Sequence, residues 1–189
     1  MRASFVLLAA VLQLAACGAI TPPPDSSTLP ADAFGAGNAG GDVWAVNWAA
    51  WAFADPSRTA GKPIDGARMA ADMEYLGGAL ATNPSFAYLP LSITSGLLAG
   101  RMEVRAVLGV PPQARSQAVV DGLEGAARAL VAGDQTAARA ALDPGIFTLG
   151  PDETLARLAH LPYMPEANSA TLRASNALLQ PGNDCLFCD

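Results

Sequence analysis

Apolar residues recur through most of this chain at the spacing of an α-helix. Between residues 112 and 132 they form one continuous stripe, made by Val119, Val120, Leu123, Ala127 and Leu130. Residues three or four positions apart share one face of a helix, so they can be buried together. The same spacing predicts further helices over 43–54, 64–81, 92–108, 134–142, 151–162 and 166–179.

Capping and breaking residues bound these segments. Asp42 is expected to cap the first helix and Asp55-Pro56 to end it, whereas Gly109 and Gly133 close the third and fourth. No segment alternates apolar and polar residues between hairpin turns, as half-buried strands do. The prediction is an all-α fold, a single compact domain of about six to seven helices over residues 42–189.

Three tryptophans, Trp44, Trp48 and Trp51, fall on one face of the first predicted helix. A tryptophan buries on the order of 200 Å² when it packs inside a protein. Aromatic residues make up only 6% of the chain, so few other large side chains are present to fill a core. We therefore expect this face to be core. The alternative is a cleft whose indoles stack on a sugar or an aromatic ligand.

Residues 17–41 have the composition of a flexible tether. They contain Pro22-Pro23-Pro24 and end in a glycine-rich stretch, and such segments bury too little apolar surface to offset the entropy of ordering. Gly35, Gly37 and Gly40 match the spacing G-x-G-x-x-G of dinucleotide-binding proteins. That motif requires a buried strand before it. No strand is predicted here, so we interpret the match as a consequence of glycine-rich composition.

The beginning of the chain has the features of an export signal. Arg2 precedes an apolar run over residues 5–12 that is too short to cross a bilayer. Leu14-Ala15-Ala16-Cys17 then resembles the lipobox of bacterial lipoprotein precursors. In that family the cysteine receives a lipid and the signal is cut before it. The resemblance therefore implies a signal peptide over residues 1–16 and lipidation of Cys17.

The same resemblance implies a place in the bacterial cell envelope, with the body facing the periplasm. Gly18 after the lipidated cysteine points to the outer rather than the inner membrane. The formal net charge is −6, and it becomes about −7 once Arg2 leaves with the signal. A negative body repels phosphate backbones, so nucleic acid is not expected as a partner.

Two cysteines near the carboxyl end, Cys185 and Cys188, form a C-x-x-C pair. A haem attachment site would need a histidine next, and Asp189 stands there instead. A zinc site would need about four ligands, and a thioredoxin-type pair would need a helix that begins at the first cysteine. We expect a disulfide suited to an oxidising compartment, with metal binding or redox exchange as the alternatives.

No catalytic group is predicted. His160 is the only histidine, and it lies at the end of a predicted helix, where a cation is mildly favourable. No nucleophile motif accompanies it. Arg101 and Arg105 stand four residues apart and would suit an anion clamp, but we expect them on a solvated, charged helix face.

These observations lead to one hypothesis and one alternative. The hypothesis is a non-catalytic envelope module without a cofactor, anchored to the membrane by its lipid, which binds a protein partner or has a structural role. Its predicted contact is the proline-flanked loop with Tyr163 and Met164, unless these side chains fold back onto the core. The alternative is a small-molecule, redox or metal role that uses a tryptophan-lined cleft or the Cys185–Cys188 pair.

Overall fold

The computed structural model describes residues 25–33 and 41–179, and within them it contains seven α-helices and no strand. The all-α prediction is therefore confirmed. The helices are α1 (Gly41–Ala54), α2 (Pro63–Thr82), α3 (Leu91–Leu108), α4 (Ser116–Val131), α5 (Gln135–Ala141), α6 (Pro151–Ala159) and α7 (Pro165–Leu179). Two short 3₁₀ helices, η1 (Pro56–Arg58) and η2 (Pro84–Phe86), lie on either side of α2.

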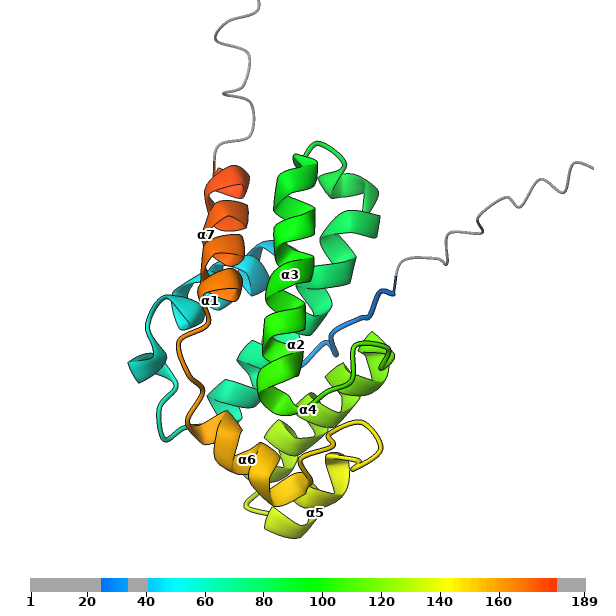
Figure 1. The fold of residues 1–189 in the computed structure, drawn as a ribbon, viewed down its shortest axis with the longest axis vertical. Helices are drawn as coiled ribbons and strands as arrows, with labels where there is room; N and C mark the ends of the chain where they lie inside the picture. Colours follow the sequence, from blue (N-terminus) through cyan, green and yellow to red (C-terminus); the bar gives the residue numbers. More distant parts are fainter. Residues whose placement is uncertain (1–24, 34–40, 180–189) are drawn as a thin grey trace, which may run out of the picture.

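Helix α2 is the centre of the molecule. It contacts α1, α3, α4 and α6, and α7 packs between α1 and α3. Figure 1 shows α3 and α7 side by side in the upper part of the molecule, with α4, α5 and α6 gathered at the lower end. The central position of α2 explains why its residues from Gly66 to Leu80 are almost all buried.

The predicted helix ends agree closely with the observed ones, except at the end of α6 and the start of α4. Helix α6 ends at Ala159, whereas the prediction ended it at Pro162. Sequence spacing places that start at Pro112, whereas α4 begins at Ser116. Residues 111–115 form a turn whose carbonyl groups on Pro111 and Pro112 accept hydrogen bonds from the Arg105 side chain. The later start follows from this contact, because those carbonyls bind a guanidinium instead of continuing the helix.

The core is built from small and medium side chains. The apolar stripes predicted for α2 and α4 are buried, including Met69, Met73, Val119 and Leu123. Alanines fill much of the remaining interior, and α7 contributes Ala167, Ala170 and Ala174. Alanine-lined faces allow helix axes to approach closely, and this feature decides which face of α1 is buried.

Residues 25–33, here called the strap, run across α2 and α4 (Figure 1). Thr28 exchanges hydrogen bonds with Gln117, and Asp32 forms a two-bond ion pair with Arg128. Ser27 is buried. This part of the segment predicted to be tether is thus packed on the folded body.

Across the described ranges, no helix combines the length and the apolar character needed to cross a membrane. Several sequence predictions fall on residues outside those ranges. They are the signal peptide over residues 1–16, the lipidation of Cys17, the glycine motif at 35–40 and the pairing of Cys185 with Cys188.

Candidate functional site

Trp44, Trp48 and Trp51 form a stacked row on the surface of α1, here called the tryptophan ladder. Trp44 is 39% exposed, Trp51 is 44% exposed, and Trp48 is half-buried between them. The prediction that these side chains form core is therefore wrong. The buried face of α1 consists instead of small residues together with Phe53: Ala45, Val46, Ala49, Ala50, Ala52 and Phe53.

The exposure of the ladder has a packing cause. Helix α1 is apolar on all sides, so hydrophobicity alone does not decide which face turns inward. The neighbouring helix α7 presents alanines to the interior. Two alanine-rich faces pack at a short interaxial distance, and three indoles would hold the helices apart. The large side chains are consequently left on the outer face.

The indoles stack on one another. The ring centroids of Trp44 and Trp48 are 5.7 Å apart with an interplanar angle of 16°, and those of Trp48 and Trp51 are 4.8 Å apart at 25°. The Arg58 guanidinium lies 5.0 Å from the Trp51 ring centroid and donates to the Trp51 carbonyl oxygen. Stacking covers the ring faces inside the row, so the ladder presents mainly indole edges.

A second polar feature lies inside the molecule, where α3 crosses α2. Arg105 is buried, and its Nε and Nη2 atoms donate to Glu74 at 2.9 and 2.5 Å. Arg101 is 7% exposed and lies one turn earlier on α3. The expectation that Arg101 and Arg105 form a solvated face is therefore wrong: both are buried among partners.

Ser116, at the start of α4, joins this cluster to the strap. Its hydroxyl accepts from Arg101 Nη1 at 2.9 Å and from Arg105 Nη2 at 3.1 Å. The same oxygen lies 2.6 Å from Glu74 Oε1 and 2.7 Å from Asp25 Oδ2. Two guanidinium groups thus face two carboxylates around one hydroxyl, and we call these residues the arginine cluster: Asp25, Glu74, Arg101, Arg105 and Ser116.

Asp25 completes the cluster from outside. Its carboxylate accepts from the Ser116 backbone N–H, and its carbonyl oxygen accepts from Arg101 Nη1 at 3.1 Å. Burial raises the pKa of Asp25, but hydrogen bonds from Ser116 and the charges of Arg101 and Arg105 outweigh it, so the pKa lies below its ordinary value. The carboxylate is therefore held in its charged form.

Sequence reasoning found the two arginines but not their partners. A signal was present, because Leu97, Arg101, Val104, Arg105 and Leu108 share one helical stripe. An arginine inside an apolar stripe indicates a buried, paired charge. The partners were out of reach, since Glu74 and Asp25 lie 31 and 80 positions before Arg105 in the sequence.

A pair of buried carboxyl groups was also missed. Asp72 on α2 and Glu124 on α4 are both buried where these helices meet. Desolvation raises the pKa of each, and for Asp72 the charge of Glu124 raises it further, while Arg68 opposes the shift. Glu124 Oε1 and Arg68 Nε are both buried. Within the described residues, Glu124 Oε1 accepts no hydrogen bond and Arg68 Nε donates none.

The predicted contact loop is divided between surface and core. Tyr163 is 55% exposed, and its hydroxyl accepts from Asn168 Nδ2 at 2.9 Å. Met164 is only 2% exposed and belongs to the core, so the predicted surface pair is reduced to Tyr163. His160 is exposed at the carboxyl end of α6, as its position at a helix end predicts.

The part of the chain that the structure describes holds no group of three or more His, Cys, Asp or Glu side chains placed to bind a metal ion. What it does present is an aromatic surface on α1 and a charged, internally bonded cluster between α2, α3 and α4. Comparison with protein-family models, curated proteins and solved structures finds no match to this chain.

Proposed function

We propose that this protein is a lipid-anchored, non-catalytic binding module of the bacterial envelope, and that it captures a protein partner through the tryptophan ladder. The single observation behind this proposal is the position of three stacked indoles on the outer face of α1. Tryptophan is enriched in the centres of protein interfaces, where a large rigid side chain contributes much contact area.

The geometry of the ladder favours a protein over a glycan. A sugar ring packs flat against an open aromatic face. Here the ring faces of Trp48 are turned toward Trp44 and Trp51, and Arg58 lies over Trp51. Indole edges carry the N–H donor and apolar carbons, a combination that suits the side chains and carbonyl groups of a protein surface.

The charge of the chain argues against an anionic lipid surface as the ladder's target. The formal net charge is −6, and a negative body is repelled by anionic headgroups. We infer that the lipid on Cys17 supplies the membrane contact, following the lipobox resemblance of residues 14–17. The ladder is then available for another molecule in the envelope.

Two further observations support a non-catalytic role. The ring of His160 makes no hydrogen bond or ion pair with any residue that the structure describes. The charged groups of the arginine cluster are bonded to one another, and only Asp25 among them is substantially exposed. A catalytic group has to reach a substrate. The Ser116 hydroxyl, which lies between Glu74 and Asp25, is fully buried, and His160 stands apart from it.

Site-specific cross-linking in the native envelope tests the proposal. The lipidated protein, with Trp51 replaced by a photoreactive phenylalanine analogue, should give a discrete cross-linked protein on irradiation. The yield should fall at least about tenfold when Trp48→Ala is added, which corresponds to the loss of one interface anchor of about 1.4 kcal/mol or more.

The matched control places the same analogue at Val131, which is 62% exposed at the end of α4, away from α1. This position should give no such adduct. Cys17→Ser should abolish acyl labelling and weaken the cross-link, because the anchor places the module beside its partner. Equal adducts from positions 51 and 131, or adducts with lipid alone, would show that the ladder is not a protein-binding surface.

A further inference from the structure

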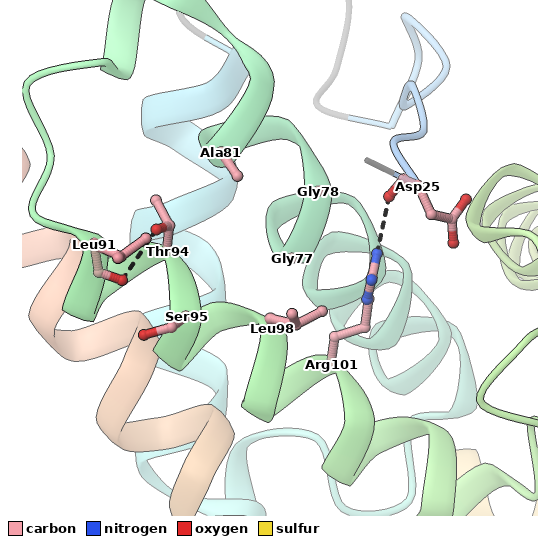
Figure 2. Close-up of a pocket in the computed structure, with 9 residues that line it drawn as sticks. All are labelled: Asp25, Gly77, Gly78, Ala81, Leu91, Thr94, Ser95, Leu98 and Arg101. Atoms are coloured by element: carbon pink, nitrogen blue, oxygen red, sulfur yellow. Dashed lines mark hydrogen bonds between the residues drawn. The ribbon is translucent and has the colours of Figure 1, made fainter. Parts of the chain in front are cut away.

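The strap crosses α2 and α4 as a segment without regular secondary structure. Residues 25–30 are neither helix nor strand, and residues 31–33 form a turn. Figure 2 shows Arg101 reaching the main-chain carbonyl oxygen of Asp25, with Gly78 of α2 beside it. A Cβ atom at Gly78 would lie 2.5 Å from this carbonyl oxygen. The main chain of the strap therefore rests directly on the backbone of α2.

Gln117 on α4 binds the main chain of the strap at one residue through two hydrogen bonds. Its Oε1 accepts from the Thr28 N–H at 2.8 Å, and its Nε2 donates to the Thr28 carbonyl oxygen at 3.2 Å. The same Nε2 donates to Asp121 Oδ1 at 2.8 Å, one turn further along α4, which fixes the orientation of the amide. A side-chain amide has one acceptor and two donors, so it can bind both main-chain groups of a residue. This contact recognises a peptide backbone.

Two carboxylates hold the ends of the strap. The Asp25 carboxylate accepts from the Ser116 backbone N–H at 3.2 Å and lies 2.7 Å from Ser116 Oγ, at the start of α4. Asp32, seven positions later, accepts from Arg128 Nε and Nη2 at 2.8 and 2.9 Å, near the end of α4. Two N–H groups of one arginine match the two oxygens of a carboxylate. The face of α2 and α4 is thus built to bind a main chain with an acidic residue at each end.

The strap itself does not fit this face fully. Ser27 is buried, and its hydroxyl has no hydrogen-bond partner within the described residues. An unpaired buried hydroxyl is costly, so alanine would fit this position better than serine. Leu29 is only partly buried against the core, and the rest of the strap is partly or fully exposed. A segment with few buried apolar contacts opens at low cost, so another segment can replace it.

We propose that the face of α2 and α4 beneath the strap is a peptide-binding site, and that the strap occupies it until a linear segment of a partner protein takes its place. The segment that fits carries two carboxylates seven positions apart, with alanine two positions after the first. A second copy of this chain is a poorer source, because its own strap is held in place by a short link to its own body and lacks the alanine. The site lies on other helices than the tryptophan ladder and goes beyond the proposed partner binding.

Fluorescence anisotropy with a synthetic peptide tests the site. The probe has the sequence of residues 25–33 with Ser27→Ala, fluorescein at its amino end and an amide at the other. It is titrated with the full-length protein in detergent and with a strap variant, Asp32→Asn with Leu29→Ala, which loosens the strap and leaves the arginine cluster unchanged. Binding to the strap variant should be saturable and at least about tenfold tighter than to wild type, because the native strap competes (about 1.4 kcal/mol). The probe with serine restored should bind the strap variant more weakly.

Changes on each side of the contact make the test specific. Gln117→Ala, added to the strap variant, removes the two main-chain hydrogen bonds and should weaken probe binding at least about threefold. Gln135→Ala is the matched control, because this exposed glutamine begins α5, outside the strap contacts, and it should leave binding unchanged. A probe with asparagine in place of both aspartates should bind at least about tenfold more weakly.

A second strap variant, Asp32→Asn alone, keeps the buried part of Leu29 and should give an intermediate affinity. The proposal is overturned if neither strap variant binds the probe, if wild type binds it as tightly as they do, or if Gln117→Ala and Gln135→Ala have equal effects. Wild-type dimers that the probe dissociates in sedimentation would also overturn it, because the replacing segment would then be the strap of a second copy.

Discussion

At the residue scale, the pair of carboxyl groups formed by Asp72 and Glu124 gives the molecule a definite pH response. Burial raises the pKa of each above its ordinary value. A buried acid with a raised pKa favours folding in its neutral form, so its stabilising contribution is complete below the pKa of the unfolded chain. That contribution is lost as the pH rises through the higher pKa of the folded state.

Asp72→Asn should therefore stabilise the protein at neutral pH. The amide keeps the shape of the protonated acid but cannot ionise. The variant should have a higher free energy of unfolding than wild type at pH 7 to 8, and the difference should shrink as the pH falls toward about 4. Urea unfolding followed by circular dichroism across this range measures it.

Asp121→Asn is the matched control, because Asp121 is an exposed carboxylate on the same helix as Glu124. It should change the pH dependence little. If Asp72→Asn is less stable than wild type at every pH, the buried carboxylate is charged and paired in the folded state, contrary to this account.

The arginine cluster shows what a single sequence can reveal at this scale. The stripe of α3 contains Arg101 and Arg105, so their burial could have been predicted. Residue type instead favoured an exposed position for both side chains, since arginine is seldom fully buried unless it is paired. The pairing itself could not be predicted, because Glu74, Asp25 and Ser116 come from three separate segments that only the tertiary fold brings together.

At the element scale, the helices were predictable because their ends are determined locally. Gly109 adopts a left-handed conformation with φ of 66°, and Asp134 accepts from the Ala137 backbone N–H, as expected for a C-terminal glycine and an N-cap. Helix α1 is an exception, because its buried face could not be predicted from its own sequence. Its sequence is apolar on every face, and the choice of buried face depends on the alanines of α7, which lie more than a hundred positions away.

Close helix contacts make some glycines essential and others replaceable. A Cβ atom at Gly66 on α2 would lie 2.0 Å from the backbone oxygen of Leu158 on α6. Gly66→Ala should therefore lower the free energy of unfolding by about 1–3 kcal/mol. Thermal and urea unfolding measure this loss.

Gly96→Ala on α3 is the contrasting variant. Its Cβ atom would lie 3.2 Å from the end of the Arg173 side chain, which is exposed and can move. The gain in helix propensity should then stabilise the protein by up to about 1 kcal/mol. We expect the free energy of unfolding to fall for Gly66→Ala and to rise for Gly96→Ala. A similar fall for both variants would show that the close approach of α2 and α6 is not what makes Gly66 essential.

At the scale of the whole molecule, the strap limits the reach of the anchor proposed at Cys17. A free tether over residues 17–41 could extend about 80 Å, at 3.3 Å per residue. Because Asp25 is bonded to Ser116 and Asp32 to Arg128, only about eight residues separate Cys17 from the folded body. They span at most about 26–29 Å, so an anchor at Cys17 keeps the body close to its membrane.

The anchor proposed at Cys17 lies eight positions before Asp25, where the strap is bonded to Ser116. Sequence composition predicted the tether but not the point of attachment. Pro30 and the small polar residues around it are typical of linkers, and their contacts with Gln117 and Arg128 depend on the position of α4.

Collisional quenching measures directly whether the tryptophan ladder lies at the surface, as the proposed partner binding requires. All three tryptophans of the chain belong to the ladder, so the whole intrinsic fluorescence reports on it. In the isolated full-length protein we predict efficient quenching by acrylamide, together with a red-shifted emission maximum typical of solvated indoles. Weak quenching and blue-shifted emission would place the indoles in the core and contradict both the exposed ladder and the binding function built on it.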